Sequence, residues 1–273
     1  MKRGLVGGAP ALPLAEAARR LGAALTAETR AAGRRLPLRF PSDYVALADP
    51  GDPHDPVRAI GWPDAEELSS DPSAFDDPVG EFGRRPHPVV VRKYADRALL
   101  LLTSRCHFYC RFCFRAGHGA DPGLAEIEEA VGTLAGDAAP AEVILSGGDP
   151  LTLADAFLAR VLDLLGALPR LRRVRIHTRA PVHDPRRVTP ALVRCLAASA
   201  PVPLRVVVHT AHPRELTPLV DEAFARFGDA GIPLLNQTVL LRGVNADPAV
   251  LADLFAGLHA RQVKPLYLHH PDR

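Results

Sequence analysis

The sequence lacks any run of about 18 apolar residues, the length that a membrane-spanning helix needs. Pro10, Pro13, Glu16 and Arg19 interrupt the basic and partly apolar N-terminus, so we expect no secretory signal. The formal net charge is only +2, which gives no reason to expect nucleic-acid binding. Three of the four cysteines lie in one short stretch, which is not the framework of a disulfide-rich secreted domain. These absences predict a cytoplasmic protein without a nucleic-acid or membrane partner.

Regular strand and helix patterns occupy residues 89–273, which we expect to form the main domain. Six β-branched or leucine-rich runs alternate with helical patterns, and this order indicates right-handed β-α-β units and a parallel sheet. The expected strands are 98–103, 142–146, 173–177, 204–209, 234–240 and 264–269. The expected helices are 124–135, 154–168, 189–198, 218–230 and 248–260. Because six strands are visible rather than eight, we predict an α/β fold with an open, partial (β/α)6 barrel.

Residues 1–88 predict a different structure, an N-terminal helical and irregular extension. Apolar residues from Leu14 to Leu25 recur with helical spacing and predict an amphipathic helix over 14–30. Residues 41–88 are rich in Asp, Pro and Gly, which few long regular elements tolerate. We expect this part to wrap around the barrel and join it to the first helix.

Polar and reactive residues gather at the carboxyl ends of the expected strands. Cysteines follow the first strand, "SGGDP" the second, "HTRAP" the third and "HTAHP" the fourth. Gln237 lies in the fifth strand and Asp272 follows the sixth. The carboxyl ends of parallel strands meet at one edge of a sheet, where α/β proteins have their active sites. We therefore expect these residues to converge on one mouth.

The cysteine motif C-x3-C-x2-C is formed by Cys106, Cys110 and Cys113. Core cysteines rarely have such close and regular spacing, and "RCHFYCRFCFR" is too polar for a core strand. A structural zinc site needs four ligands, and His107 or His118 could complete it. Alternatively, thiolates hold four-iron clusters, and three ligands on one loop leave one iron open for a small molecule. Cys195 is not the expected fourth ligand, because it lies within a predicted helix.

A second motif lies at the end of the second expected strand, in the sequence "VILSGGDPLTL". Its core residues are Ser146, Gly147, Gly148 and Asp149. Paired glycines let a backbone approach a ligand closely, although structural turns also use them.

In its place after a first strand, the cysteine motif resembles that of the radical S-adenosylmethionine (SAM) superfamily. The resemblance implies a [4Fe–4S] cluster on the three cysteines, with SAM bound at the open iron and cleaved to a 5′-deoxyadenosyl radical. It also implies a flavodoxin- or ferredoxin-type electron donor. The SAM contacts that it implies are Phe112, Ser146, Gly147, Gly148, Asp149, His209 and Gln237.

Longer strings, such as "KYADRALLLLTSRCHFYCRFCFR" and "GIPLLNQTVLLRGVN", resemble the lysine 2,3-aminomutases, including those that make β-lysine for elongation factor P. This resemblance implies amino-group migration on L-lysine or a related amino acid, with pyridoxal 5′-phosphate (PLP) as a second cofactor. Arg115 would bind the substrate carboxylate and Asp272 the distal ammonium group, while Arg97 and Arg179 would contact PLP. The resemblance leaves the oligomeric state open.

The sequence departs from this family in two places. The family has a C-terminal segment with the lysine that forms a Schiff base to PLP, whereas this sequence ends at Arg273 and its only lysines are Lys2, Lys93 and Lys264. We expect a truncated chain or a lost PLP anchor, and little turnover by this chain. The loop "FRAGHGADPG" also replaces a basic, aromatic run near the substrate. A PLP-independent radical SAM enzyme and a non-catalytic iron–sulfur or zinc protein remain alternatives.

Overall fold

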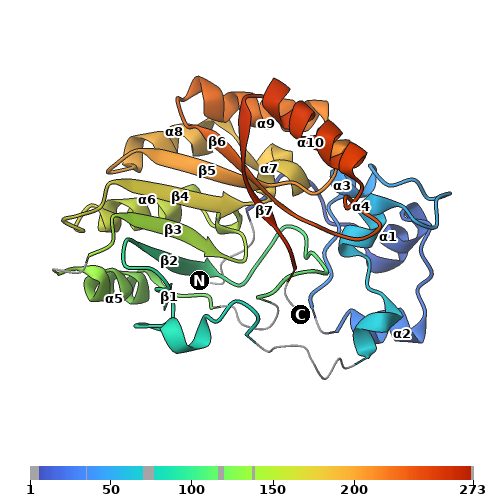
Figure 1. The fold of residues 1–273 in the computed structure, drawn as a ribbon, viewed down its shortest axis with the longest axis horizontal. Coiled ribbons are helices and arrows are strands. Elements are labelled where there is room, and N and C mark those ends of the chain that lie inside the picture. Colours follow the sequence, from blue (N-terminus) through green and yellow to red (C-terminus); the bar gives the residue numbers. More distant parts are fainter. Residues whose placement is uncertain (1–5, 35, 70–76, 116–119, 137–138, 272–273) are drawn as a thin grey trace.

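The computed structural model describes residues 6–34, 36–69, 77–115, 120–136 and 139–271. One seven-stranded sheet forms its centre, with the strands in chain order (Figure 1). They are β1 (Val90–Val91), β2 (Arg97–Thr103), β3 (Glu142–Gly147), β4 (Arg173–Thr178), β5 (Leu204–His209), β6 (Leu234–Val239) and β7 (Val263–His269).

Strands β2 to β7 are parallel and match the six predicted strands to within one residue at each end. The short β1, which the sequence analysis does not predict, pairs antiparallel with β2. Within the described ranges the edge strands β1 and β7 do not pair with each other, so the sheet is open. The predicted partial barrel is therefore confirmed.

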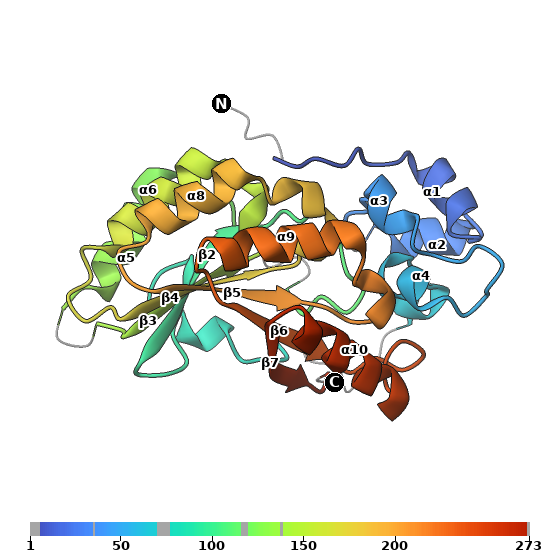
Figure 2. The same ribbon diagram turned by 90° about the horizontal axis from the view of Figure 1, so that it is seen from above.

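Five predicted helices cover one face of the sheet, and Figure 2 shows α6, α8 and α9 side by side over it. Their bounds are α5 (Leu124–Leu134), α6 (Asp155–Leu165), α8 (Pro190–Ser199), α9 (Pro218–Asp229) and α10 (Pro248–Ala260). Thr189, Thr217 and Asp247 cap α8, α9 and α10, each directly before a proline, a strong signal for a helix start. Among the helices of the described residues, none is long and apolar enough to cross a membrane.

The predicted N-terminal helix over 14–30 is wrong in extent, because the chain forms two short helices, α1 (Leu14–Arg20) and α2 (Ala27–Ala32). Gly22 separates them with φ at +60°. A Cβ at this position would lie 2.0 Å from the carbonyl oxygen of Pro50. Only glycine fits this turn, so close packing ends the helix where periodicity alone continues it.

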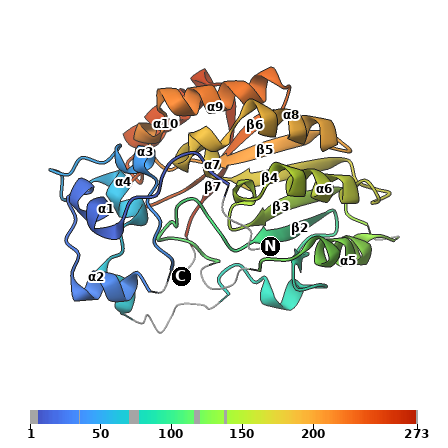
Figure 3. The same ribbon diagram turned by 180° about the vertical axis from the view of Figure 1, so that it is seen from behind.

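The rest of the N-terminal extension consists of short elements, as predicted. They are α3 (Ser42–Val45), α4 (Pro56–Gly61) and the 3-10 helices η1 (Ala65–Leu68) and η2 (Phe82–Arg84). Phe40 and Tyr44 belong to the same hydrophobic core as the barrel. Figure 1 shows α1 to α4 beyond the arrowheads of the parallel strands, and Figure 3 shows α3 next to α7 (Ala180–His183). The extension therefore packs on the carboxyl edge of the sheet.

Buried charges tie the inner face of the sheet together. Arg175 on β4 donates to Glu142 on β3 (Nη2–Oε2, 2.8 Å) and to the Tyr267 hydroxyl on β7 (Nη1–Oη, 3.0 Å). Arg175 and Glu142 are almost completely buried, where an unpaired charge would be costly. Because two strands separate β4 from β7, this contact requires the sheet to curve into a partial barrel.

Candidate active site

The loop between β2 and α5 carries the three cysteines at the carboxyl edge of the sheet; residues 104–115 are called the cysteine loop below. Phe108, 3% exposed, anchors it, with its ring centroid 4.7 Å from that of Tyr44 and 4.5 Å from that of His183. The backbone N–H of Arg111 donates to a carbonyl of α4 (2.9 Å). The N-terminal extension and α7 thus hold the cysteine loop in place.

All three cysteines of the loop are half-buried, and none is in a disulfide within the described part of the chain. Burial raises the pKa of the Cys110 thiol to about 11, although the nearby Arg179 acts in the opposite direction. Burial also raises the pKa of Cys106 and of Cys113. In the ligand-free protein these groups are therefore thiols at neutral pH, and any metal that binds them must release their protons.

The three thiols of the cysteine loop are a donor set that an iron–sulfur cluster can use. Across the residues that the structure describes, no three His, Cys, Asp or Glu side chains are gathered closely enough to hold one ion. The zinc alternative stays open, because His118, one of its possible ligands, lies outside the described residues. Four irons in a cubane keep their cysteine sulfurs farther apart, and three thiols on one loop match three of its corners.

Arg179, directly after β4, contacts the cysteine loop. Its Nη1 donates to Cys110 Sγ (2.7 Å) and its Nη2 donates to Glu215 Oε1 (2.8 Å). Burial would lower the pKa of this guanidinium, but the facing Cys110 and Glu215 raise it overall, so Arg179 is charged. The family resemblance associates Arg179 with PLP, whereas its observed partners are a cysteine and a glutamate.

Gly147 and Gly148 let the cysteine loop pack against the end of β3. Gly147 has φ at +115°, and a Cβ there would lie 2.4 Å from the carbonyl oxygen of Thr103. A Cβ on Gly148 would lie 2.4 Å from the carbonyl oxygen of Arg105. Both glycines are therefore required by backbone packing, the structural explanation that the sequence analysis left open.

Asp149 joins the ends of β3 and β4. Its Oδ1 accepts hydrogen bonds from the Thr178 hydroxyl (2.6 Å) and the Leu151 N–H (3.0 Å). Its Oδ2 accepts one from the backbone N–H of Arg179 (2.8 Å). This buried carboxylate therefore positions the backbone that carries Arg179.

Phe112 and His209 face each other, with ring centroids 5.5 Å apart, as expected for residues of one mouth. The Nε2 atom of His209 is buried and has no hydrogen-bond partner among the described residues. Burial lowers the pKa of His209 well below its usual range, so its ring is neutral. Gln237 is the register partner of His209 on the neighbouring strand β6. These residues could flank a ligand and offer it hydrogen bonds.

Arg115 has partners that the sequence analysis does not predict. Its Nε donates to Glu81 Oε2 (3.1 Å), its Nη2 donates to Glu81 Oε1, and its Nη1 donates to the Ser146 hydroxyl (3.2 Å). Arg85 lies 3.8 Å from the same glutamate. In the sequence, Glu81 ends the run "DDPVGE" of the irregular segment. No pattern in that run distinguishes Glu81 from a solvent-exposed acidic residue, so the sequence does not predict it as part of the site.

One predicted site residue lies away from this mouth, and another is outside the part of the chain that the structure describes. Arg97 begins β2 at the opposite, amino edge of the sheet, where it forms an ion pair with Asp96 (3.1 Å). Asp272 lies outside the described residues.

The inner wall also contains a histidine that the sequence analysis notes only as part of "HTRAP". His177 Nε2 is buried without a hydrogen-bond partner in the described chain. Burial, with a smaller effect from Arg175, Arg115 and His269, lowers the pKa of His177 to about 3. Its ring is therefore neutral, and like His209 it presents an unpaired nitrogen to the interior.

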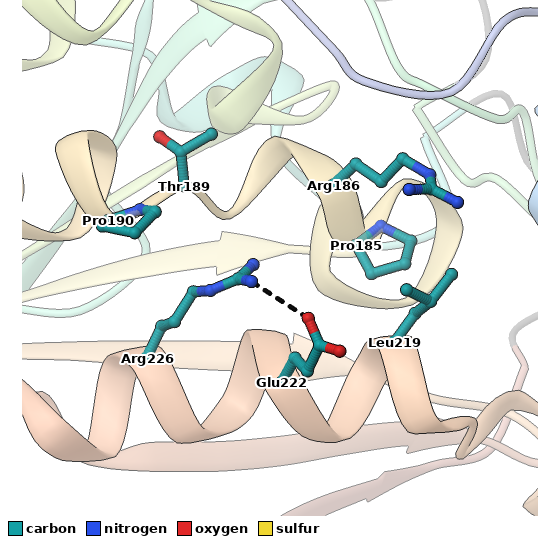
Figure 4. Close-up of a pocket in the computed structure, with 7 residues that line it drawn as sticks. All are labelled: Pro185, Arg186, Thr189, Pro190, Leu219, Glu222 and Arg226. Atoms are coloured by element: carbon teal, nitrogen blue, oxygen red, sulfur yellow. Dashed lines mark hydrogen bonds and ion pairs between the residues drawn. The ribbon is translucent and has the colours of Figure 1, made fainter.

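Figure 4 shows a surface pocket that is unrelated to this mouth. Its volume is about 270 Å³, and it lies between α9 and the segment after α7. Glu222 and Arg226 form an ion pair along its wall (3.0 Å). None of its lining residues belongs to the cysteine loop or to a strand end, so it is not the candidate active site. The lining residues are Pro185, Arg186, Thr189, Pro190, Leu219, Glu222 and Arg226.

Known proteins share this sequence pattern. A sequence model described as the Radical SAM superfamily matches residues 100–255. L-lysine 2,3-aminomutase from Clostridium subterminale is 39% identical over 233 residues, covering 84% of this chain and 56% of that protein. L-lysine 2,3-aminomutase from Escherichia coli (strain K12) is 36% identical over 250 residues, covering 89% and 72%. Glutamate 2,3-aminomutase from Clostridioides difficile (strain 630) is 34% identical over 229 residues, covering 82% and 54%.

The chain thus spans little more than half the length of two of these three relatives. Among solved structures, native anSMEcpe with bound AdoMet superposes with a TM-score of 0.46 at 12% identity, covering 63% of this chain and 51% of that one.

Proposed function

Because the chain belongs to the radical SAM superfamily and, within it, to the lysine 2,3-aminomutase family, we propose that it is a radical SAM aminomutase. Its reaction moves an amino group between neighbouring carbons of L-lysine or of a related amino acid such as glutamate. When bound, a [4Fe–4S] cluster supplies the electron that splits SAM into methionine and a 5′-deoxyadenosyl radical. The observation that carries the proposal is three thiols on one loop, beside a neutral buried histidine whose ring nitrogen is unpaired among the described residues.

In this proposal Cys106, Cys110 and Cys113 hold three corners of the cluster. The ring of Phe112 offers an apolar surface to the nucleoside, and His209 Nε2 and the Gln237 amide offer it hydrogen bonds. A neutral His209 suits SAM, because a charged imidazole would repel the positive sulfonium.

Arg115 binds the carboxylate of the amino acid in this proposal. A guanidinium holds two carboxylate oxygens through parallel hydrogen bonds, the arrangement that Arg115 already makes with Glu81. Substrate binding therefore requires the hydrogen bonds between Arg115 and Glu81 to break. Arg85, 3.8 Å from Glu81, remains as its partner, and Ser146 keeps the guanidinium oriented.

The described residues do not fit covalent attachment of PLP. Lys93 lies between β1 and β2 and donates to the Val79 carbonyl, and Lys264 is exposed at the start of β7. Both lysines are at the amino edge of the parallel strands, away from the cysteine loop. Arg179, which the family resemblance associates with PLP, is instead paired with Cys110 and Glu215. We therefore assign no described residue to PLP.

The test is anaerobic reconstitution of the wild-type chain and of two single variants, Cys110→Ala and Cys195→Ala. We expect the wild type to bind iron and sulfide in the ratio of a [4Fe–4S] cluster and to release 5′-deoxyadenosine from SAM with dithionite. Cys195 lies in α8, so Cys195→Ala should retain both properties, whereas Cys110→Ala should lose them. Zinc without iron in the wild type would contradict the proposal.

A second candidate, left open by the sequence, is a radical SAM enzyme that does not use PLP. Lysine and glutamate, each with and without added PLP, separate the candidates when the products are followed by NMR. PLP-dependent amino migration supports the aminomutase, whereas 5′-deoxyadenosine formation without migration on any amino acid tested supports the second candidate. An intact cluster that never cleaves SAM would instead identify a non-catalytic iron–sulfur protein.

A further inference from the structure

A row of four hydrogen-bonded side chains connects the N-terminal extension to the cysteine loop. Tyr44 on α3 donates from its hydroxyl to Glu215 Oε1 (2.6 Å). Arg179 donates to the same oxygen (2.8 Å) and, from its other terminal nitrogen, to Cys110 Sγ (2.7 Å). Tyr44 is 2% exposed, Glu215 0% and Arg179 9%, so water does not screen these charges effectively.

The position of the Arg179 guanidinium is fixed from several sides. Asp149 accepts the backbone N–H of Arg179, and the ring of Phe112 lies 5.7 Å from the guanidinium carbon. Glu215 is fixed as well, because its second oxygen accepts the backbone N–H groups of Ala211 and His212. The donor that faces Cys110 is therefore built into the fold rather than a mobile side chain.

Charge and hydrogen bonding at a ligand sulfur change the reduction potential of an iron–sulfur cluster. A reduced cluster carries one more negative charge, and a cationic donor at the sulfur stabilises that state and raises the potential. The carboxylate of Glu215 lies on the far side of the same guanidinium. Its negative charge opposes the gain of an electron and therefore lowers the reduction potential. The two residues therefore act on the potential with opposite signs.

We propose that Arg179 and Glu215 set the reduction potential of the cluster bound at Cys110, with Arg179 as a positioning residue that donates to the ligand sulfur. The inference rests on the proposed cluster and goes beyond it, since it assigns a role to two residues outside the cysteine motif. Removing Arg179 deprives the sulfur of its donor and leaves Glu215 uncompensated, so the potential falls. Neutralising Glu215 leaves the charge of Arg179 uncompensated, so the potential rises.

The experiment is a redox titration of the reconstituted cluster with dithionite and mediators, followed by EPR in the absence of SAM and amino acid. We expect a lower midpoint potential for Arg179→Gln, a higher one for Glu215→Gln, and an intermediate value for the double variant. Arg261, directly after α10, forms an ion pair with Asp221 on α9, so Arg261→Gln and Asp221→Asn are matched controls that should titrate as wild type.

The outcomes separate this inference from the proposed function. If the wild type assembles no cluster, the proposed function fails and this inference fails with it. If the cluster assembles but both variants titrate at the wild-type potential, or shift in the same direction, the inference alone is overturned. If Arg179→Gln does not assemble a cluster, Glu215→Gln and Arg179→Lys decide. A higher midpoint potential for Glu215→Gln, together with a potential near the wild-type value for Arg179→Lys, supports the inference. An unchanged midpoint potential for Glu215→Gln refutes it.

Discussion

The carboxylate of Glu81 accepts two hydrogen bonds from the guanidinium of Arg115. Glu81 therefore occupies the two donors that the proposed substrate carboxylate needs. Both side chains are well shielded from water, with 6% of Glu81 and 14% of Arg115 exposed. Such paired, charge-assisted hydrogen bonds are among the stronger polar contacts in proteins. An amino acid must compete with Glu81 for Arg115, and this competition can be measured.

Glu81→Gln should tighten amino-acid binding about fivefold, since a neutral amide competes less well by about 1 kcal/mol. The measurement is the dissociation constant of the amino acid by calorimetry on reconstituted protein with SAM. Glu222→Gln, an exposed glutamate on α9, should leave the constant unchanged. Weaker binding by Glu81→Gln would instead mean that Glu81 orients Arg115 for the substrate.

Arg115→Met should lower the free energy of unfolding by about 2–3 kcal/mol, because it leaves the buried Glu81 with a weaker partner. Arg85, 3.8 Å away, keeps the loss below that of an isolated charge. Urea unfolding of ligand-free protein measures the effect. The double variant Glu81→Gln/Arg115→Met should recover most of the loss, and purely additive losses would count against a direct pair.

Gly148→Ala should destabilise the ligand-free protein by about 3 kcal/mol and prevent cluster assembly, because its Cβ has no room beside the backbone of Arg105. Gly132→Ala in α5 is the matched control, since a Cβ there meets nothing within 4 Å. We expect the control to gain about 0.5–1 kcal/mol from helix propensity. Thermal unfolding and iron content test both; equal behaviour of the two variants would refute the packing argument.

His177 should make the ligand-free protein sensitive to acid. Its pKa is lowered from 6.5 to about 3 in the folded state, so the unfolded chain binds the extra proton between these values. Stability is complete above the unfolded value and falls as the pH drops toward 3, by about 2 kcal/mol between about pH 7 and pH 5. His177→Phe should lose correspondingly less over this range in urea titrations, and an unchanged pH profile would exclude His177 as a cause.

Sequence patterns predict the strands and the cysteine loop well because both are local. Buried apolar runs alternate with amphipathic helices, so the six parallel strands differ from prediction by one residue at most. The helix break at Gly22 is not predictable in this way, because contact with Pro50, distant in sequence, requires it. The predicted periodicity continues across that glycine without interruption.

Side-chain partners are harder to predict than elements. Glu81 precedes Arg115 by 34 residues, and Arg179 follows Cys110 by 69 residues. These pairs exist because loops after different strands meet at one edge with the N-terminal extension. The sequence indicates that residues converge on this edge, but their order around the mouth depends on packing. The same limit explains why the packing role of Gly147 and Gly148 becomes clear only in the structure.

The docking of the N-terminal extension has a consequence for how the chain is made. Ala9 bonds to Asp184, Tyr44 to Glu215 and Asp55 to Arg214, and these partners are 159 to 175 residues apart in sequence. At ordinary rates of translation the first third of the polypeptide leaves the ribosome on the order of ten seconds before its partners exist. Until these partners are synthesised, the N-terminal extension cannot form its native contacts and stays unfolded or bound to a chaperone. Tyr44 and α4 help to hold the cysteine loop. Iron that is delivered before synthesis is nearly finished would therefore reach a cysteine loop without its native packing.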